Sequence, residues 1–95
     1  SDLDRMHKPA IVYAAGQGRA ELVAALVDAG VPANTAYEHQ LTALMWAAGQ
    51  GHADTVSTLL AKGADAGLRD DRGLTARDIA LQAGHAKVAE QLGPH

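Results

Sequence analysis

Cysteine and phenylalanine are absent from this chain of 95 residues, and its only aromatic residues are Tyr13, Tyr37 and Trp46. The absence of cysteine excludes disulfides, thiolate catalysis and Cys-ligated metal sites, and it is compatible with any redox compartment. The compartment therefore stays open: we favour the cytoplasm, and a periplasmic or secreted location is also compatible with the sequence.

Basic residues are few and are not clustered. The formal net charge is −3, and a phosphate backbone requires grouped Lys and Arg side chains, so nucleic acid is not an expected partner. No apolar run approaches the roughly 20 residues that cross a bilayer, so the sequence predicts no membrane span.

The most informative feature present is an internal repeat with a period of 33 residues. Displacing the chain by 33 positions places Ala-Ala-Gly-Gln-Gly at 14–18 on the same residues at 47–51, and eleven of 33 compared positions are identical. A second displacement places 41–43 on 74–76, with eight of 24 positions identical. Such a period is typical of solenoids. We predict a single domain over residues 1–95, with repeats at about 4–36, 37–69 and 70–93.

Each repeat is expected to contain two short antiparallel helices. Thr42 can cap a first helix over 43–48 because its hydroxyl can accept a free backbone N–H, and Gly51 ends that helix. Apolar residues at 56, 59 and 60 then share one face of a second helix over 54–61. Helices this short are stable only when pairs stack. The predicted fold class is all-α, with helix-turn-helix units joined by extended loops or short β-hairpins.

The repeats resemble the ankyrin repeat, whose consensus is Asp-x-x-Gly-x-Thr-Pro-Leu-His-x-Ala-Ala-x-x-Gly-His, followed by an amphipathic helix and Gly-Ala-Asp. The matching segments are Leu-Thr-Ala-Leu-Met-Trp-Ala-Ala-Gly-Gln-Gly-His at 41–52, Gly-Ala-Asp at 63–65, and 70–80, and the resemblance covers 4–93. The chain is identified as a member of this family, with a residue bias similar to that of bacterial members. The resemblance implies an ankyrin solenoid that binds another protein.

Several positions depart from the family pattern. The consensus His is replaced by Val12, Met45 and Asp78, and the second loop has Tyr37 and Gln40 where the family prefers Asp and Gly. The second loop therefore lacks the turn residues that the family prefers.

Two further patterns give structural expectations. After the second helix, Asn34 and Gly67 occupy the same repeat position, and both residue types tolerate positive φ, which predicts a tight turn there. The third repeat has polar residues that suit the uncovered end of a solenoid, namely Arg77, Asp78, Glu90 and Gln91.

The resemblance implies a contact surface on the concave face, formed by the loop tips and the first helices. Carried over by position, the partner-binding candidates are Tyr37, Glu38, His39, Leu41, Trp46, Gln50, Asp71, Arg72 and Leu74. Trp46 is ambiguous, because Tyr13 and Ile79 align with it and this favours packing between repeats, whereas aromatic side chains also dominate interface energetics.

No catalytic, cofactor or metal site is predicted. Asp70 and Asp71 are the only adjacent carboxylates, and in the family's loop they take a structural and a solvent-facing position. His52 and His85 lie about 8–10 Å apart if their helices pack as neighbours, too far for one zinc ion with ligands at about 2.0–2.1 Å. We expect these histidines to stabilise turns.

The sequence therefore favours a non-enzymatic protein-interaction module that has no cofactor and is monomeric. The alternative is a structural or targeting segment of a larger enzyme or effector whose active domain lies outside this chain. The alternative is motivated by a start at Ser1 instead of Met and by Pro9 at the position of the first capping Thr.

Overall fold

The computed structural model describes residues 10–93, apart from the Glu38 side chain, so Pro9 and the predicted start of the first repeat lie outside the described residues. The described part contains three helix pairs: α2 (Ala10–Gly16) with α3 (Ala20–Asp28), α4 (Ala43–Gln50) with α5 (Ala53–Ala61), and α6 (Ala76–Gln82) with α7 (Ala86–Gln91). A short 3-10 turn, η1 (Glu38–Gln40), precedes α4. Residues 10–93 contain no strand, so the predicted all-α fold class is confirmed, with extended loops as connections.

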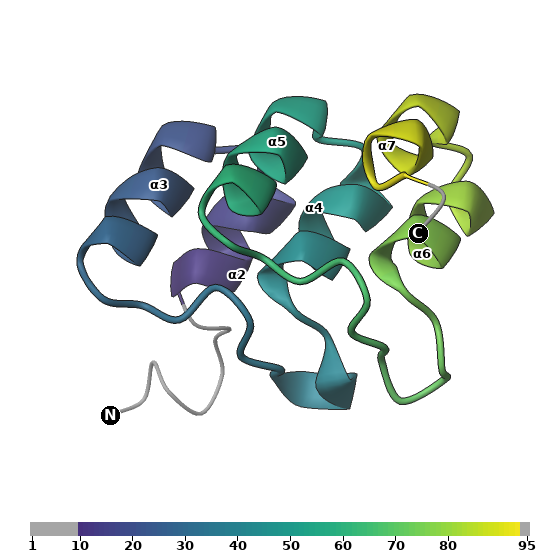
Figure 1. Cartoon of the computed structure of the whole chain (residues 1–95), viewed down its shortest axis with the longest axis horizontal. Helices are drawn as coiled ribbons and strands as arrows, with labels where there is room; N and C mark the ends of the chain where they lie inside the picture. Colours follow the sequence, from purple (N-terminus) through teal and green to yellow (C-terminus); the bar gives the residue numbers. More distant parts are fainter. Residues whose placement is uncertain (1–9, 94–95) are drawn as a thin grey trace.

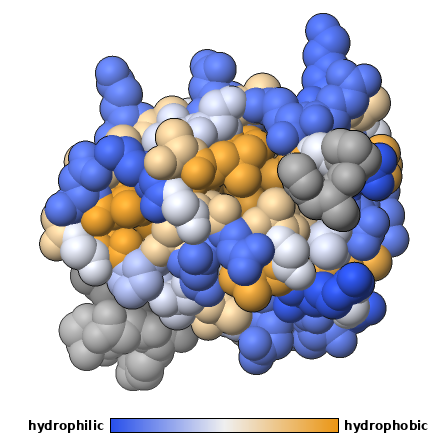
Figure 2. All heavy atoms as spheres, in the orientation of Figure 1, coloured by the Kyte–Doolittle hydropathy of each residue, from blue (hydrophilic) through white to orange (hydrophobic). Residues whose placement is uncertain are grey.

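The helix pairs stack side by side in two layers (Figure 1). The first helices α2, α4 and α6 form one layer, the second helices form the other, and each helix packs on its own partner and on its counterpart in the next pair. The long loops all extend from the same side of the stack. Figure 2 shows hydrophobic residues along the middle of one face, bordered by hydrophilic residues above and below. No helix in the described range is long and apolar enough to cross a membrane.

The core combines alanines with a few larger side chains. The first helices bury small residues where they meet, which lets neighbouring helices approach closely. The predicted apolar face of α5 is confirmed, since Val56 and Leu59 are fully buried and Leu60 is half-buried against the core. The largest fully buried side chains are Ile11, Leu44, Met45, Leu59, Val12, Val23, Val56 and Thr55.

The predicted cap at Thr42 is confirmed. The Thr42 hydroxyl accepts from the Met45 N–H at 3.3 Å, and the Met45 sulfur accepts from the Thr42 N–H at 3.4 Å. Thr75 and Asp78 form the same reciprocal pair, with both distances at 3.2 Å. Asp78 is half-buried, so it serves as a cap residue instead of the solvent-facing end residue we expected. Gly51 ends α4 with φ at 77°, as predicted.

The polar C-terminal end is only partly as expected. Arg77 and Glu90 are exposed, which agrees with the prediction for an uncovered solenoid end. Gln91 is different, because its amide donates to the Ala53 carbonyl at 3.1 Å and to the Ser57 hydroxyl at 2.5 Å. The prediction was wrong for Gln91, which joins α7 to α5.

The turn after each second helix forms without positive φ at Asn34 or Gly67, so that part of the prediction was wrong. Asn34 instead acts through its side chain: its amide donates to the Gly63 carbonyl at 3.1 Å, and its oxygen accepts from the Asp65 N–H at 2.6 Å. These two bonds connect the loop after α3 to the loop after α5.

Candidate functional site

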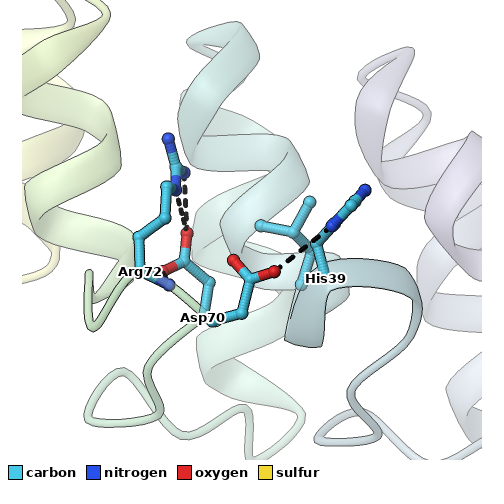
Figure 3. Close-up of a pocket in the computed structure, with 5 residues that line it drawn as sticks. His39, Asp70 and Arg72 are labelled. Carbon is cyan, nitrogen blue, oxygen red and sulfur yellow. Dashed lines mark hydrogen bonds and ion pairs between the residues drawn. The ribbon is translucent and has the colours of Figure 1, made fainter.

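The loops before α4 and α6 together form a pocket of about 330 Å³, called the loop pocket below. His39 and Leu41 come from the loop before α4, and Asp70, Asp71 and Arg72 come from the loop before α6. Figure 3 shows His39 on one side of this pocket and Asp70 with Arg72 on the other. Residues about thirty positions apart therefore meet at one site because the repeats place their loops side by side.

Asp70 organises the loop before α6. Its side chain is only 1% exposed, and one carboxylate oxygen accepts from the backbone N–H groups of Arg72 and Leu74 at 2.8 and 3.0 Å. The other oxygen accepts from Nε and Nη2 of Arg72 at 3.0 and 2.6 Å. Desolvation by burial raises the pKa of Asp70, but the bonds from Leu74 and Arg72 outweigh it, so the net pKa lies below the ordinary value. Asp70 is therefore an ionised structural residue.

The loop before α4 adopts a similar turn with residues less suited to it. The Tyr37 N–H donates to the Leu41 carbonyl at 2.9 Å, as the Asp70 N–H does to the Leu74 carbonyl. His39 and Gln40 both have φ at 61°, and Gln40 aligns with Gly73, whose φ is 81°. A left-handed conformation costs a non-glycine residue about 1–2 kcal/mol. Strained backbone of this kind is concentrated at functional sites.

The two loops are also joined to each other. The Asp71 N–H donates to the His39 carbonyl at 3.0 Å, and Nδ1 of His39 lies 3.2 Å from a carboxylate oxygen of Asp71. The two side chains remain 67% and 47% exposed. The loop pocket is thus a connected surface on which a polar pair faces solvent.

A second pocket of about 290 Å³, called the aromatic groove below, lies between α2 and α4. It is lined by Val12, Tyr13, Gly16, Gln17, Trp46 and Gln50. A Cβ atom at Gly16 would lie 3.8 Å from the Trp46 ring, so the indole packs closely over this glycine. Trp46 is half-buried against the core and also lines the groove, so packing and surface exposure are combined in one side chain.

The structure separates the predicted contact residues into three sets. His39, Leu41, Asp71 and Arg72 line the loop pocket, and Trp46 and Gln50 line the aromatic groove. Tyr37 packs against the core and, like Leu74, lines neither pocket. Nothing is described of the Glu38 side chain.

The two pockets also include five residues outside the predicted set, namely Val12, Tyr13, Gly16, Gln17 and Asp70. Tyr13 is 43% exposed although its repeat position had been assigned to packing. Asp70 was assigned a structural role, and the structure adds that it also borders the pocket.

His52 and His85 stabilise the turns of the preceding helix pair. His52 Nε2 lies 3.0 Å from the Gly16 carbonyl oxygen. Its ring covers Gly18, where a Cβ atom would come within 2.6 Å, and the His85 ring covers Gly51 in the same way. Within residues 10–93, no three His, Cys, Asp or Glu side chains are grouped for a metal ion.

Stacked helix pairs whose loops meet along one side define a helical repeat solenoid. The family model for ankyrin repeats, in three copies, matches residues 11–95, and the chain belongs to this family. Comparison with curated proteins finds no match. Ankyrin repeats are generally protein–protein interaction modules, and the family is typically non-catalytic.

Proposed function

We propose that this chain binds a partner protein through its predicted concave surface, which comprises the loop pocket and the aromatic groove. The observation that carries the proposal is the loop pocket itself. Two loops from consecutive helix pairs line one pocket and are connected to each other by hydrogen bonds.

The residue types on this surface suit protein recognition. Trp, Tyr and Arg are enriched among the residues that contribute most binding energy, and the two pockets expose Trp46, Tyr13 and Arg72. The loops are held by internal hydrogen bonds before any partner arrives, which lowers the entropy lost on binding. A partner would therefore meet an ordered surface.

The proposal is tested with a pair of variants that add equal charge to opposite layers. Gln17→Arg with Gln50→Arg places two bulky cations at exposed positions in the aromatic groove. The matched control, Ala25→Arg with Ala61→Arg, places two bulky cations at exposed positions of the second helices. Proteins captured by the tagged chain are identified by mass spectrometry, and the affinity of each purified partner is measured for all three proteins.

We expect the groove variant to bind at least about tenfold more weakly, because the few residues that dominate an interface each contribute about 2 kcal/mol or more, and Trp46 and Tyr13 are of the residue types enriched among them. The control should bind as the unaltered chain does. Equal affinities for the two variants would refute the assignment of binding to this surface. They would favour a structural or targeting role, in which the stacked helices serve a longer protein without using these pockets.

A further inference from the structure

The two loops together carry more negative than positive charge. Residues 37–41 and 70–74 contain the three carboxylates Glu38, Asp70 and Asp71 but one guanidinium, Arg72. Asp70 and Arg72 form a close pair in which the carboxylate is almost fully buried. Beside this pair, the remaining carboxylate on the described lining of the loop pocket is that of Asp71.

Asp71 is placed to meet a charged group from outside. Its side chain is 47% exposed, and its contact with His39 uses one carboxylate oxygen. Leu41, half-buried, lines the same pocket. An apolar wall beside a carboxylate fits a side chain with an aliphatic stem and a cationic end, which is the character of Lys and Arg.

The aromatic groove favours the same kind of side chain. Its lining contains no charged residue and presents the Tyr13 and Trp46 rings together with the amides of Gln17 and Gln50. Aromatic faces attract a Lys or Arg cation within about 6 Å of the ring centre. The Gln50 amide oxygen can accept a hydrogen bond from such a cation, whereas the Gln17 oxygen already accepts from Nε of Arg19 at 3.0 Å. Arg19 is bonded to Gln17 but is not part of the lining, so the lining itself offers no cation to an acidic partner side chain.

We propose that the partner of this chain is a basic protein segment, with one Lys or Arg side chain in the loop pocket between Leu41 and Asp71 and further basic side chains over the aromatic groove. This inference rests on the proposed function and specifies its partner. The charge complementarity of Asp71 and the uncharged aromatic lining are its basis. The chain as a whole, at −3, adds a weak long-range attraction for a basic partner.

The test starts with a phage-displayed library of short random peptides selected on the whole chain. Enriched peptides are synthesised, and their affinities are measured for the unaltered chain, for Asp71→Asn and for Asp54→Asn. Asp54 is an exposed carboxylate in the first turn of α5 and lines neither the loop pocket nor the aromatic groove. It therefore controls for the loss of one negative charge from the protein.

We expect enrichment of Lys and Arg over the starting library, about fivefold weaker binding to Asp71→Asn, and less than about twofold change for Asp54→Asn. Replacing the critical Lys or Arg of a peptide by Gln should weaken binding to the unaltered chain but should add little to the loss already seen with Asp71→Asn. Raised salt should weaken the binding of the basic peptides to the chain.

Two results would overturn the inference. Enriched peptides that lack basic residues, yet lose affinity for the Gln17→Arg and Gln50→Arg variant, would refute a basic partner and leave the proposed binding surface intact. Failure to enrich any peptide that responds to this variant or to Asp71→Asn would count against both the inference and the proposed function.

Discussion

Replacing Thr55 by Val should stabilise the fold. Thr55 in α5 is fully buried, and its hydroxyl has no hydrogen-bond partner among the described residues. Burying an unpaired hydroxyl costs about 1–3 kcal/mol in protein mutational data. Valine keeps the branched shape at Cβ and has a similar helix propensity. We therefore expect the free energy of unfolding to rise by about 1–2 kcal/mol, and the melting temperature by about 4–8 °C per kcal/mol in a domain of this size.

The measurement is urea unfolding followed by far-ultraviolet circular dichroism and by the fluorescence of Trp46, the single tryptophan. Thr42→Val is the matched control, because Thr42 is also buried but its hydroxyl accepts the Met45 N–H. Loss of this cap should destabilise the fold by about 1 kcal/mol. The same chemical change should thus have opposite signs at the two sites. Destabilisation by Thr55→Val would refute the reasoning, since it would mean that the Thr55 hydroxyl is hydrogen-bonded in solution.

Three other substitutions have defined expectations, all measurable by the same urea titration. Gln40→Gly should stabilise the fold by about 0.5–1 kcal/mol, because glycine adopts the left-handed conformation freely, as Gly73 does at the aligned position. The greater chain entropy that glycine loses on folding offsets part of this gain. A loss of stability would show that Gln40 is not strained. Asn34→Ala should destabilise by about 1 kcal/mol, since its side chain joins two loops, one through the Asp65 N–H; an unchanged midpoint would show that these bonds contribute nothing. Asp70→Asn should cost about 2 kcal/mol at neutral pH by weakening charge-assisted bonds. The pKa of Asp70 is lowered in the folded state, so its stabilising effect is present above the unfolded-state pKa and is lost as pH falls through the folded-state pKa; the variant should therefore show a shallower loss of stability in acid, and an equal pH dependence would contradict this role.

The helical architecture could be predicted because it depends on residues that recur with the repeat. Thr42 and the apolar positions of α5 are local signals, and the structure uses them as the sequence indicated. The role of His52 in a turn could also be predicted, because a histidine follows a glycine at the same position in two repeats. Recurrence identifies what every repeat needs for stacking.

Features that occur in one repeat only were harder to predict. The repeat pattern gave no reason for Gln91 to bond to the preceding pair, because Thr58 aligns with it and has a shorter side chain. The exposure of Tyr13 could not be predicted from the repeat either, because the aligned residues Trp46 and Ile79 are more buried than Tyr13. A contact between repeats depends on a side chain from each of two repeats, whereas the pattern within one repeat gives information about only one of these side chains.

The loop pocket shows how such a contact between repeats shapes a candidate site. The loop before α6 has its own buried carboxylate, Asp70, whereas the aligned residue in the loop before α4 is Tyr37, which has none. The left-handed residue His39 is instead held from outside, through its carbonyl and its ring, by Asp71. Since Asp70 fixes the loop that carries Asp71, it also determines where His39 lies. The shape of the proposed binding surface therefore depends on a residue whose side chain is almost wholly buried and hence inaccessible to a partner.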